Sequence, residues 1–203
     1  MTSQPRTAQP PTQDREPLQP NGQRYDYVAL ALASNDELEH VMRCSVSPDP
    51  ARLVGWEFRG WNTFDLTQVL GIRKFKKGFY QEDPVADPAH GINGYNVQTV
   101  LNGLGEDWFD KIKEGNSIKH GWYDCGPVDL SATDNKYPNG LLINYDCDKN
   151  PTFDPSRKLR DYIVQPYADN DDLLLGKAYI ALVGPLRLFI SYFVLERYNE
   201  STL

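Results

Sequence analysis

Two pairs of cationic and phenolic side chains are the residues with the clearest chemical potential. Arg160 and Tyr162 are separated by one residue, and so are Lys177 and Tyr179. Alternate residues of a β-strand share a face, so each pair would place a cation beside a phenol. Such a pair can hold a carboxylate through charge-assisted hydrogen bonds. The pattern therefore predicts a ligand-binding site, provided that these side chains face the interior of the protein.

The opposite orientation of the same strands stays open, because alternation does not say which face is buried. If Arg160 and Tyr162 face solvent, we expect them to pair with Asp161 or Glu196 across the sheet. Tyr192, on the strand that follows Lys177, depends on the same choice of face. These residues are ligand candidates only if their face is the inner one.

Asp124, His120 and Tyr145 support a second hypothesis. In a dry cavity such groups can transfer protons, because burial shifts their pKa values. They would then serve an isomerase or cyclase of secondary metabolism. The chain contains no nucleophile-elbow, phosphate-loop or dinucleotide-binding motif, so no catalytic residue is assigned from a motif and no cofactor is expected.

The segment from Asp146 to Asn150 resembles the start of a calcium loop, with acidic or amide side chains at alternate positions. The loop requires a glycine next and a bidentate acid at its end, but Pro151 and Arg157 occupy those positions. We therefore interpret the segment as a turn between strands and expect no metal site.

Composition narrows the function classes. The chain has 203 residues, a net charge of -7 and a pI of about 5.0. No basic stripe is long enough for nucleic acid. The densest basic run, residues 73–77, alternates with one phenylalanine and is interpreted as a solvated strand face.

Three widely spaced cysteines do not form a disulfide framework, and the first residues contain no apolar signal segment. Both observations predict a cytoplasmic location. The most apolar window, residues 178–195, is broken by Gly184 and Pro185 and contains Arg187, so no membrane span is expected. Nothing in the sequence indicates the oligomeric state.

Three regions are predicted along the chain. Residues 1–24 are rich in proline and glutamine and should be disordered. Residues 25–48 should be helical, with Ser34 and Glu37 forming a capping box. Residues 50–199 should form one β domain. Its strands are expected at residues 53–61, 72–80, 94–101, 118–123, 141–145, 157–165, 173–183 and 186–198.

Residues 173–198 anchor this domain, since two apolar runs flank a Gly-Pro turn in the pattern of a β-hairpin. A lone hairpin is unstable in water, so further strands must complete the sheet. We predict a mainly β fold, an antiparallel up-and-down barrel of about eight strands, with an N-terminal helix and a short helix over residues 62–70. The last strand should pair with the first, which removes the free sheet edges.

The first strand contains Gly55-Trp56 and Gly60-Trp61, and the chain later contains an Asp-Asp-Leu-Leu-Leu-Gly turn at residues 171–176 and Phe-Val-Leu-Glu-Arg at residues 193–197. With this strand order, the sequence resembles the calycin barrels (lipocalins and fatty-acid-binding proteins), and among them the bacterial Gly-x-Trp-x-Gly barrel proteins. The resemblance implies an interior site for a small apolar or amphipathic molecule. It also implies that Trp61 packs against Arg187 or Arg197.

The predicted function is therefore binding of a small apolar or amphipathic ligand, with or without a carboxylate, inside a lipocalin-like barrel. Arg59 and Trp61 join the ligand candidates, with a structural cation–π stack as their alternative role. A barrel-type isomerase or cyclase is the second hypothesis. A side-chain-filled barrel that serves as a non-catalytic interaction module is the third.

Overall fold

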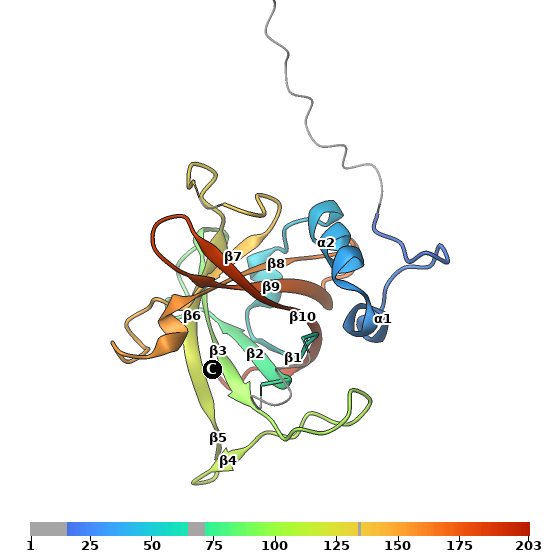
Figure 1. Ribbon diagram of the computed structural model, residues 1–203. Coiled ribbons are helices and arrows are strands. Elements are labelled where there is room, and N and C mark those ends of the chain that lie inside the picture. The colour runs from blue at the N-terminus through green and yellow to red at the C-terminus, as the bar shows by residue number, and fades with distance from the viewer. Residues whose placement is uncertain (1–15, 65–71, 134) are drawn as a thin grey trace, which may run out of the picture.

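The computed structural model describes residues 16–64, 72–133 and 135–203. Eight antiparallel strands close into a barrel in the order β1-β10-β9-β8-β7-β6-β3-β2 (Figure 1). These strands are β1 (Trp56–Asn62), β2 (Lys74–Tyr80), β3 (Ile92–Gln98), β6 (Lys119–Pro127), β7 (Leu141–Asn144), β8 (Leu159–Val164), β9 (Leu173–Ala181) and β10 (Arg187–Glu200). A separate small hairpin joins β4 (Ile112–Lys113) to β5 (Asn116–Ser117). The predicted barrel of eight antiparallel strands is confirmed.

The barrel closes where the sequence predicts, between its first and last strands. Gly60 lies opposite Leu195, and Trp61 lies opposite Val194. β10 also pairs with β9, so the hairpin over residues 173–198 supplies two adjacent strands of the wall. The short helix predicted for residues 62–70 falls largely on residues 65–71, which lie outside the described residues.

Two helices form within the predicted helical segment and pack on the outside of the wall. α1 (Tyr27–Leu32) contacts β10, and α2 (Asn35–Cys44) contacts β9. The capping box forms as predicted: the Glu37 carboxylate accepts the Ser34 N–H at 2.9 Å, and Ser34 Oγ accepts the Glu37 N–H. Two short 3₁₀ turns, η1 (Pro88–His90) and η2 (Pro155–Lys158), and the four-residue helix α3 (Pro50–Leu53) complete the fold.

Residues 16–24, the end of the segment predicted to be disordered, contact the barrel. The Tyr167 hydroxyl donates a hydrogen bond of 2.8 Å to the Pro17 carbonyl. Arg24 pairs with Glu16 at 2.7 Å and with Asp169 at 3.0 Å. Residues 1–15, where most of the predicted disorder falls, lie outside the described residues.

The interior of the barrel is filled at one end. Aromatic and aliphatic side chains from most strands pack there, with Leu53 of α3 beneath them. Phe193 of β10 lies across Gly176 of β9, and a Cβ on that glycine would be 2.1 Å from the Phe193 ring. Glycine is thus required wherever a ring crosses a neighbouring strand inside the wall. The filled end leaves the opposite half of the interior for the cavity described below.

The three lysines of the basic run at residues 73–77 are buried, which corrects the prediction of this run as a solvated face. Lys74, Lys76 and Lys77 are 2%, 4% and 2% exposed. Lys76 lies on the outer face, where its ammonium is 2.8 Å from Glu57 and 2.7 Å from Asp110. Lys77 points into the barrel. Charged side chains are buried here because each finds specific partners, which a count of charges does not reveal.

A last-strand arginine stacks on a first-strand tryptophan, but the pair differs from the predicted one. The Arg197 guanidinium lies 4.7 Å from the centre of the Trp56 ring. Trp61 is instead covered by Arg73 at 4.9 Å. The difference arises because Trp56 and Trp61 are an odd number of residues apart and so face opposite sides of β1.

Candidate functional site

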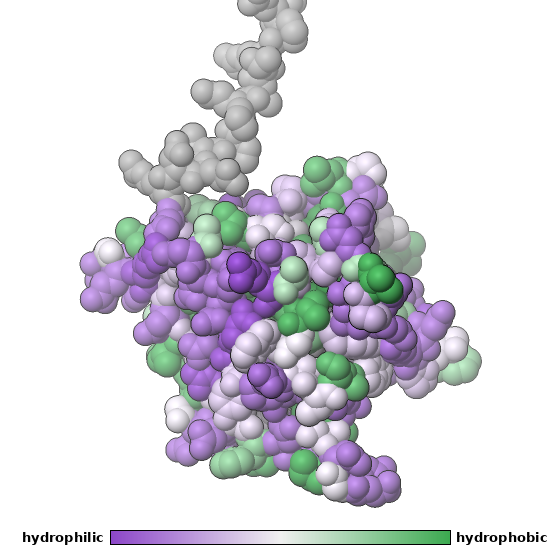
Figure 2. Space-filling view, turned by 180° about the vertical axis from the view of Figure 1, so that it is seen from behind, coloured by the Kyte–Doolittle hydropathy of each residue, from purple (hydrophilic) through white to green (hydrophobic). Residues whose placement is uncertain are grey.

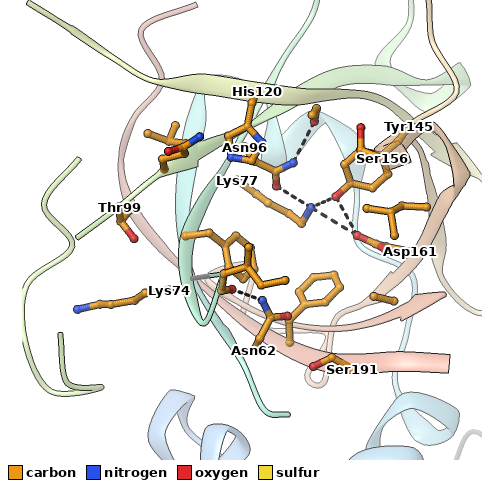
Figure 3. A pocket seen from close by; sticks show the side chains of 18 of the residues that line it. Asn62, Lys74, Lys77, Asn96, Thr99, His120, Tyr145, Ser156, Asp161 and Ser191 are labelled. Atoms are coloured by element: carbon orange, nitrogen blue, oxygen red, sulfur yellow. Dashed lines mark hydrogen bonds and ion pairs between the residues drawn. The ribbon is translucent and has the colours of Figure 1, made fainter. Parts of the chain in front are cut away.

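A cavity of about 470 Å³ occupies the open half of the barrel (Figure 3). It lies between the ends of β1, β3, β7 and β9 and the starts of β2, β6, β8 and β10. Apolar side chains form much of its wall, and polar side chains converge at its floor. The apolar lining includes Phe75, Leu159, Ala178, Ile190 and Phe193.

Lys77 is at the centre of the polar floor, as Figure 3 shows. Phe75, Lys77 and Phe79 are alternate residues of β2, so the apolar face that turns inward carries the lysine with it. The Lys77 ammonium donates to Asn96 Oδ1 at 3.0 Å and to the Tyr145 hydroxyl. It lies 3.5 Å from Asp161 Oδ2. The ammonium thus has two hydrogen-bond acceptors and one ion-pair partner, all of them protein oxygens.

Asp161 supplies the opposite charge. It alternates with Leu159 and Ile163 on the inward face of β8 and is 4% exposed. Its Oδ2 accepts a hydrogen bond of 2.9 Å from the Tyr145 hydroxyl. Its Oδ1 has no hydrogen-bond partner among the described residues. The floor is therefore an ion pair tied to a phenol, with one carboxylate oxygen left unsatisfied.

Burial changes the acid–base properties of this floor. Loss of water lowers the pKa of the Lys77 amine and raises the pKa of the Asp161 carboxyl, while the attraction between them opposes both shifts. Burial also raises the pKa of Tyr145 well above its ordinary range. The two charges cancel, so the floor can offer hydrogen bonds or exchange a proton without presenting a net charge.

Two of the three predicted proton-transfer residues line the cavity. Tyr145 belongs to the floor, and His120 lies at the rim with an exposed side chain. Asp124 lies on the outer face of β6, where it accepts a hydrogen bond of 3.0 Å from Asn93. Asp124 therefore does not join the other two.

None of the seven predicted ligand residues lines this cavity. Arg59, Trp61, Arg160, Tyr162, Lys177, Tyr179 and Tyr192 all lie on the outer face of the wall. The inner face of the same strands carries Asp161, Ala178 and Phe193 instead. Of the two orientations that the sequence left open, the cation–phenol pairs thus have the outward one, and their role in ligand binding stays a prediction.

Four of the seven residues are gathered beneath α2. Tyr162, Lys177, Tyr179 and Tyr192 pack there with Tyr137. Glu39 of α2 is the common partner of three of these side chains: its Oε2 accepts hydrogen bonds from Lys177 at 2.6 Å, Tyr137 at 2.7 Å and Tyr192 at 2.8 Å. We call this the helix cluster. It joins a helix to the barrel by hydrogen bonds.

The helix cluster shifts the pKa of Glu39 downward. Partial burial acts to raise this pKa, but the hydrogen bonds from Lys177, Tyr137 and Tyr192 outweigh it and hold the value at about 2. Glu39 therefore remains a carboxylate through the physiological range. Hydrogen bonds from the protein already occupy Glu39 Oε2.

The remaining three predicted residues have separate partners. Arg160 donates to the carbonyls of Arg157 and Leu159 at 2.8 and 2.7 Å. Arg59 pairs with Glu196 and lies 4.7 Å from the Tyr27 ring. These contacts fasten the η2 turn and α1 to the wall. The cross-strand pairing expected if Arg160 faced outward, to Asp161 or Glu196, is replaced by bonds to backbone carbonyls.

Lys77, Asp161 and Asn96 were missed as site residues, although the sequence contains a signal for the first two. Lys77 stands between Phe75 and Phe79, and Asp161 between Leu159 and Ile163. A single charge within an alternating apolar face indicates a buried functional or structural charge. Asn96 offers no comparable signal, since its neighbours at alternate positions are Gly94 and Gln98.

Possible metal ligands are not clustered in the described part of the chain: no group of three or more His, Cys, Asp or Glu side chains could hold an ion. In the segment that resembles a calcium loop, Asp146 pairs with Arg157 at 2.6 Å. The Asn150 side chain accepts a hydrogen bond from the Trp122 N–H and donates to the carbonyls of Trp122 and Tyr145.

No helix in the described ranges is long and apolar enough to cross a membrane.

Comparison with known proteins places the chain in no group. No protein-family model matches it, and a search of curated proteins finds no match.

Proposed function

We propose that the protein binds a small apolar or amphipathic molecule in the barrel cavity, with the polar end of that molecule on the floor formed by Lys77, Asp161, Tyr145 and Asn96. The observation that carries the proposal is an apolar-walled cavity of about 470 Å³ that ends on one convergent polar network. Ligand pockets have this size and this division between wall and floor. The apolar wall supplies affinity, and the floor supplies orientation.

The charge balance of the floor favours a neutral polar group over a carboxylate. A carboxylate would have to compete with Asp161 for the ammonium of Lys77, whose donors already reach protein oxygens. Placing a second negative charge in a dry site is costly. A hydroxyl can both donate and accept within such a network. Of the two ligand types predicted from the sequence, we therefore favour the uncharged one.

A calycin-type relationship is part of this proposal. The closed eight-stranded antiparallel barrel and the Arg197–Trp56 stack between last and first strands support it. An interior cavity also supports binding over the hypothesis of a side-chain-filled interaction module. A cytoplasmic location and the absence of nucleic-acid binding stay predictions from the sequence.

Calorimetric titration with a matched pair of twelve-carbon probes, 1-dodecanol and dodecanoic acid, tests the proposal. We expect the wild type to bind dodecanol, and to bind the acid at least about tenfold more weakly. Ala178→Phe places a ring in the cavity and should remove binding of both. Lys177→Met, on the opposite face of the same strand, is the matched control and should bind like the wild type. Equal binding by wild type and Ala178→Phe would contradict the proposal.

A second candidate function is acid–base catalysis, which the opposite pKa shifts of Lys77 and Asp161 favour. A base with a lowered pKa beside an acid with a raised one is suited to moving a proton next to a carbonyl. Deuterium exchange of cyclohexanone α-protons in D₂O, followed by NMR, tests this reading. Catalysis predicts exchange that Lys77→Met abolishes. An exchange rate that this variant leaves unchanged would remove the candidate.

A further inference from the structure

The loops around the cavity mouth expose large apolar side chains. The mouth is bordered by the described residues of the connections 63–73, 99–118, 145–158 and 182–186. Phe153 is 97% exposed, Val183 85%, Leu186 61%, and Phe109 and Ile112 each 59%. In the described residues of the three connections at the filled end (81–91, 128–140 and 165–172), only Val85 and Leu130 are comparable. Exposed apolar side chains that gather in one region usually meet a partner.

Charge is also divided between the two ends. The described residues of the mouth connections contain six basic and seven acidic side chains. Those of the filled-end connections contain one basic and seven acidic side chains. The two sets of connections contain equal numbers of acidic side chains, but the difference in basic ones gives a net charge of -1 at the mouth and -6 at the filled end. Near an anionic surface this distribution would turn the mouth toward that surface, because the filled end is repelled.

The shape of the apolar region indicates the kind of partner. The β9–β10 tip, residues 182–186, contains Leu182, Val183, Gly184, Pro185 and Leu186 and no charge. Other exposed apolar residues occupy the tips of separate loops. On the back of the molecule relative to Figure 1, apolar side chains lie as separate spots among hydrophilic ones and form no continuous patch (Figure 2). Protruding apolar tips on separate loops suit insertion into a lipid interface better than a flat contact with a protein, which needs a continuous complementary core.

We propose that the mouth of the barrel docks on the surface of a lipid bilayer. Val183 and Leu186 of the hairpin tip enter the interfacial region, with Phe109, Ile112 and Phe153 on neighbouring loops. The cavity then opens toward the acyl chains. Docking of the mouth is inferred from side-chain exposure and charge and does not depend on the proposed ligand binding. Only the passage of a ligand from the membrane into the cavity rests on the proposed function.

Co-sedimentation of the ligand-free protein with phosphatidylcholine vesicles, with and without phosphatidylglycerol, tests the docking. We expect the wild type to sediment with both, and no more with the anionic vesicles, because the mouth connections have no excess of basic side chains and the whole protein has a net charge of -7. The double variant Val183→Asp/Leu186→Asp should bind at least about tenfold more weakly, because two apolar contacts with the interface are replaced by charges. The matched control is Val85→Asp/Leu130→Asp, which adds the same charges to exposed positions at the filled end. It should stay within about twofold of the wild type, the change expected from net charge alone.

Three results would overturn the proposal. The wild type could remain in the supernatant with both vesicle types. The two double variants could lose binding equally, which would show a net-charge effect. The wild type could form a dimer in gel filtration that only Val183→Asp/Leu186→Asp disrupts, without binding vesicles, which would assign the mouth to self-association. Circular dichroism of each variant shows whether it folds, and single substitutions replace a double variant that does not. Failure here leaves the dodecanol titration unaffected, so the two proposals are separable.

Discussion

Two clusters built from the same kinds of side chain lie on opposite faces of the barrel wall. Inside, Lys77, Asp161 and Tyr145 border a cavity. Outside, the helix cluster joins Lys177 to Glu39 and Tyr137 beneath α2. Each combines a lysine, an acid and a tyrosine within hydrogen-bonding distance. They differ in what covers them, which is open space in one case and a helix in the other.

That difference sets the state of the acid in each cluster. Glu39 accepts three hydrogen bonds, and its pKa falls to about 2. Asp161 accepts fewer, is more deeply buried, and has a raised pKa. A carboxylate that accepts several hydrogen bonds from the protein is a fixed structural charge. A carboxylate that accepts few can still bind a ligand group or a proton. Residue types alone therefore do not identify the functional cluster.

The largest expected effect comes from breaking the inner cluster. Lys77→Met leaves the Asp161 carboxylate buried without its counter-charge, and we expect a loss of about 3–5 kcal/mol in the free energy of unfolding. Urea denaturation measures it. A loss below about 1 kcal/mol would show that the ion pair is not a buried one.

A double variant separates stability from binding. Lys77→Met/Asp161→Leu removes both charges, so most of the lost stability should return. Dodecanol binding should remain weakened in this double variant, since the orienting floor is gone. Full recovery of binding would mean that the apolar wall alone holds the ligand.

Breaking the helix cluster should have an intermediate effect. Glu39→Gln replaces the shared carboxylate with a neutral amide, and we expect a loss of about 1–3 kcal/mol in unfolding free energy. Dodecanol affinity should not change, because the cluster lies outside the cavity. A drop in dodecanol affinity equal to that of Lys77→Met/Asp161→Leu would erase the distinction between the two clusters.

Lowering the pH should remove the stability that the Glu39 carboxylate contributes. The pKa of Glu39 is lowered from 4.5 to about 2 in the folded protein, so its stabilising effect is complete above pH 4.5 and is lost as the pH falls toward 2. Urea denaturation of wild type and Glu39→Gln between pH 7 and pH 3 should show the two stabilities converging as the pH falls. A difference that is constant over this range would contradict the assignment.

The smallest effect is expected at Arg160. Its guanidinium binds two backbone carbonyls on the outer face and lies 3.8 Å from Asp146. Arg160→Ala should cost about 1 kcal/mol or less. It should leave the affinity for both twelve-carbon probes unchanged. Loss of dodecanoic acid binding in this variant would restore the arginine–tyrosine site predicted from the sequence.

The strands of the barrel could be predicted because they depend on local alternation and on turn residues such as Gly184. The face of each strand that turns inward could not be settled in the same way at Arg160 and Lys177. Both faces of β8 and β9 are packed, one against the barrel interior and the other against α2 and the tyrosines of the helix cluster. Because a helix covers the outer face, tyrosines gather there as densely as apolar residues gather inside.

The site could be predicted only in part for the same reason. Tyr145 and His120 were identified because their chemistry stands out. Lys77 was hidden within a basic run whose other members, Lys74 and Lys76, face outward. Asp161 was considered only as a partner for its neighbours. Lys77 and Asp161 are 84 positions apart in the sequence. They meet only because the barrel closes, so the sequence of neither strand alone predicts the pair.

Native mass spectrometry of the protein purified from its own cells tests the central claim most directly. If the cavity binds a small amphipathic molecule, the wild type should carry one additional small-molecule mass in a one-to-one complex. Ala178→Phe, purified in parallel, should lack it, while Lys177→Met should retain it. The same added mass on wild type and Ala178→Phe would contradict the account, as would a wild type free of bound molecules that also fails to bind 1-dodecanol.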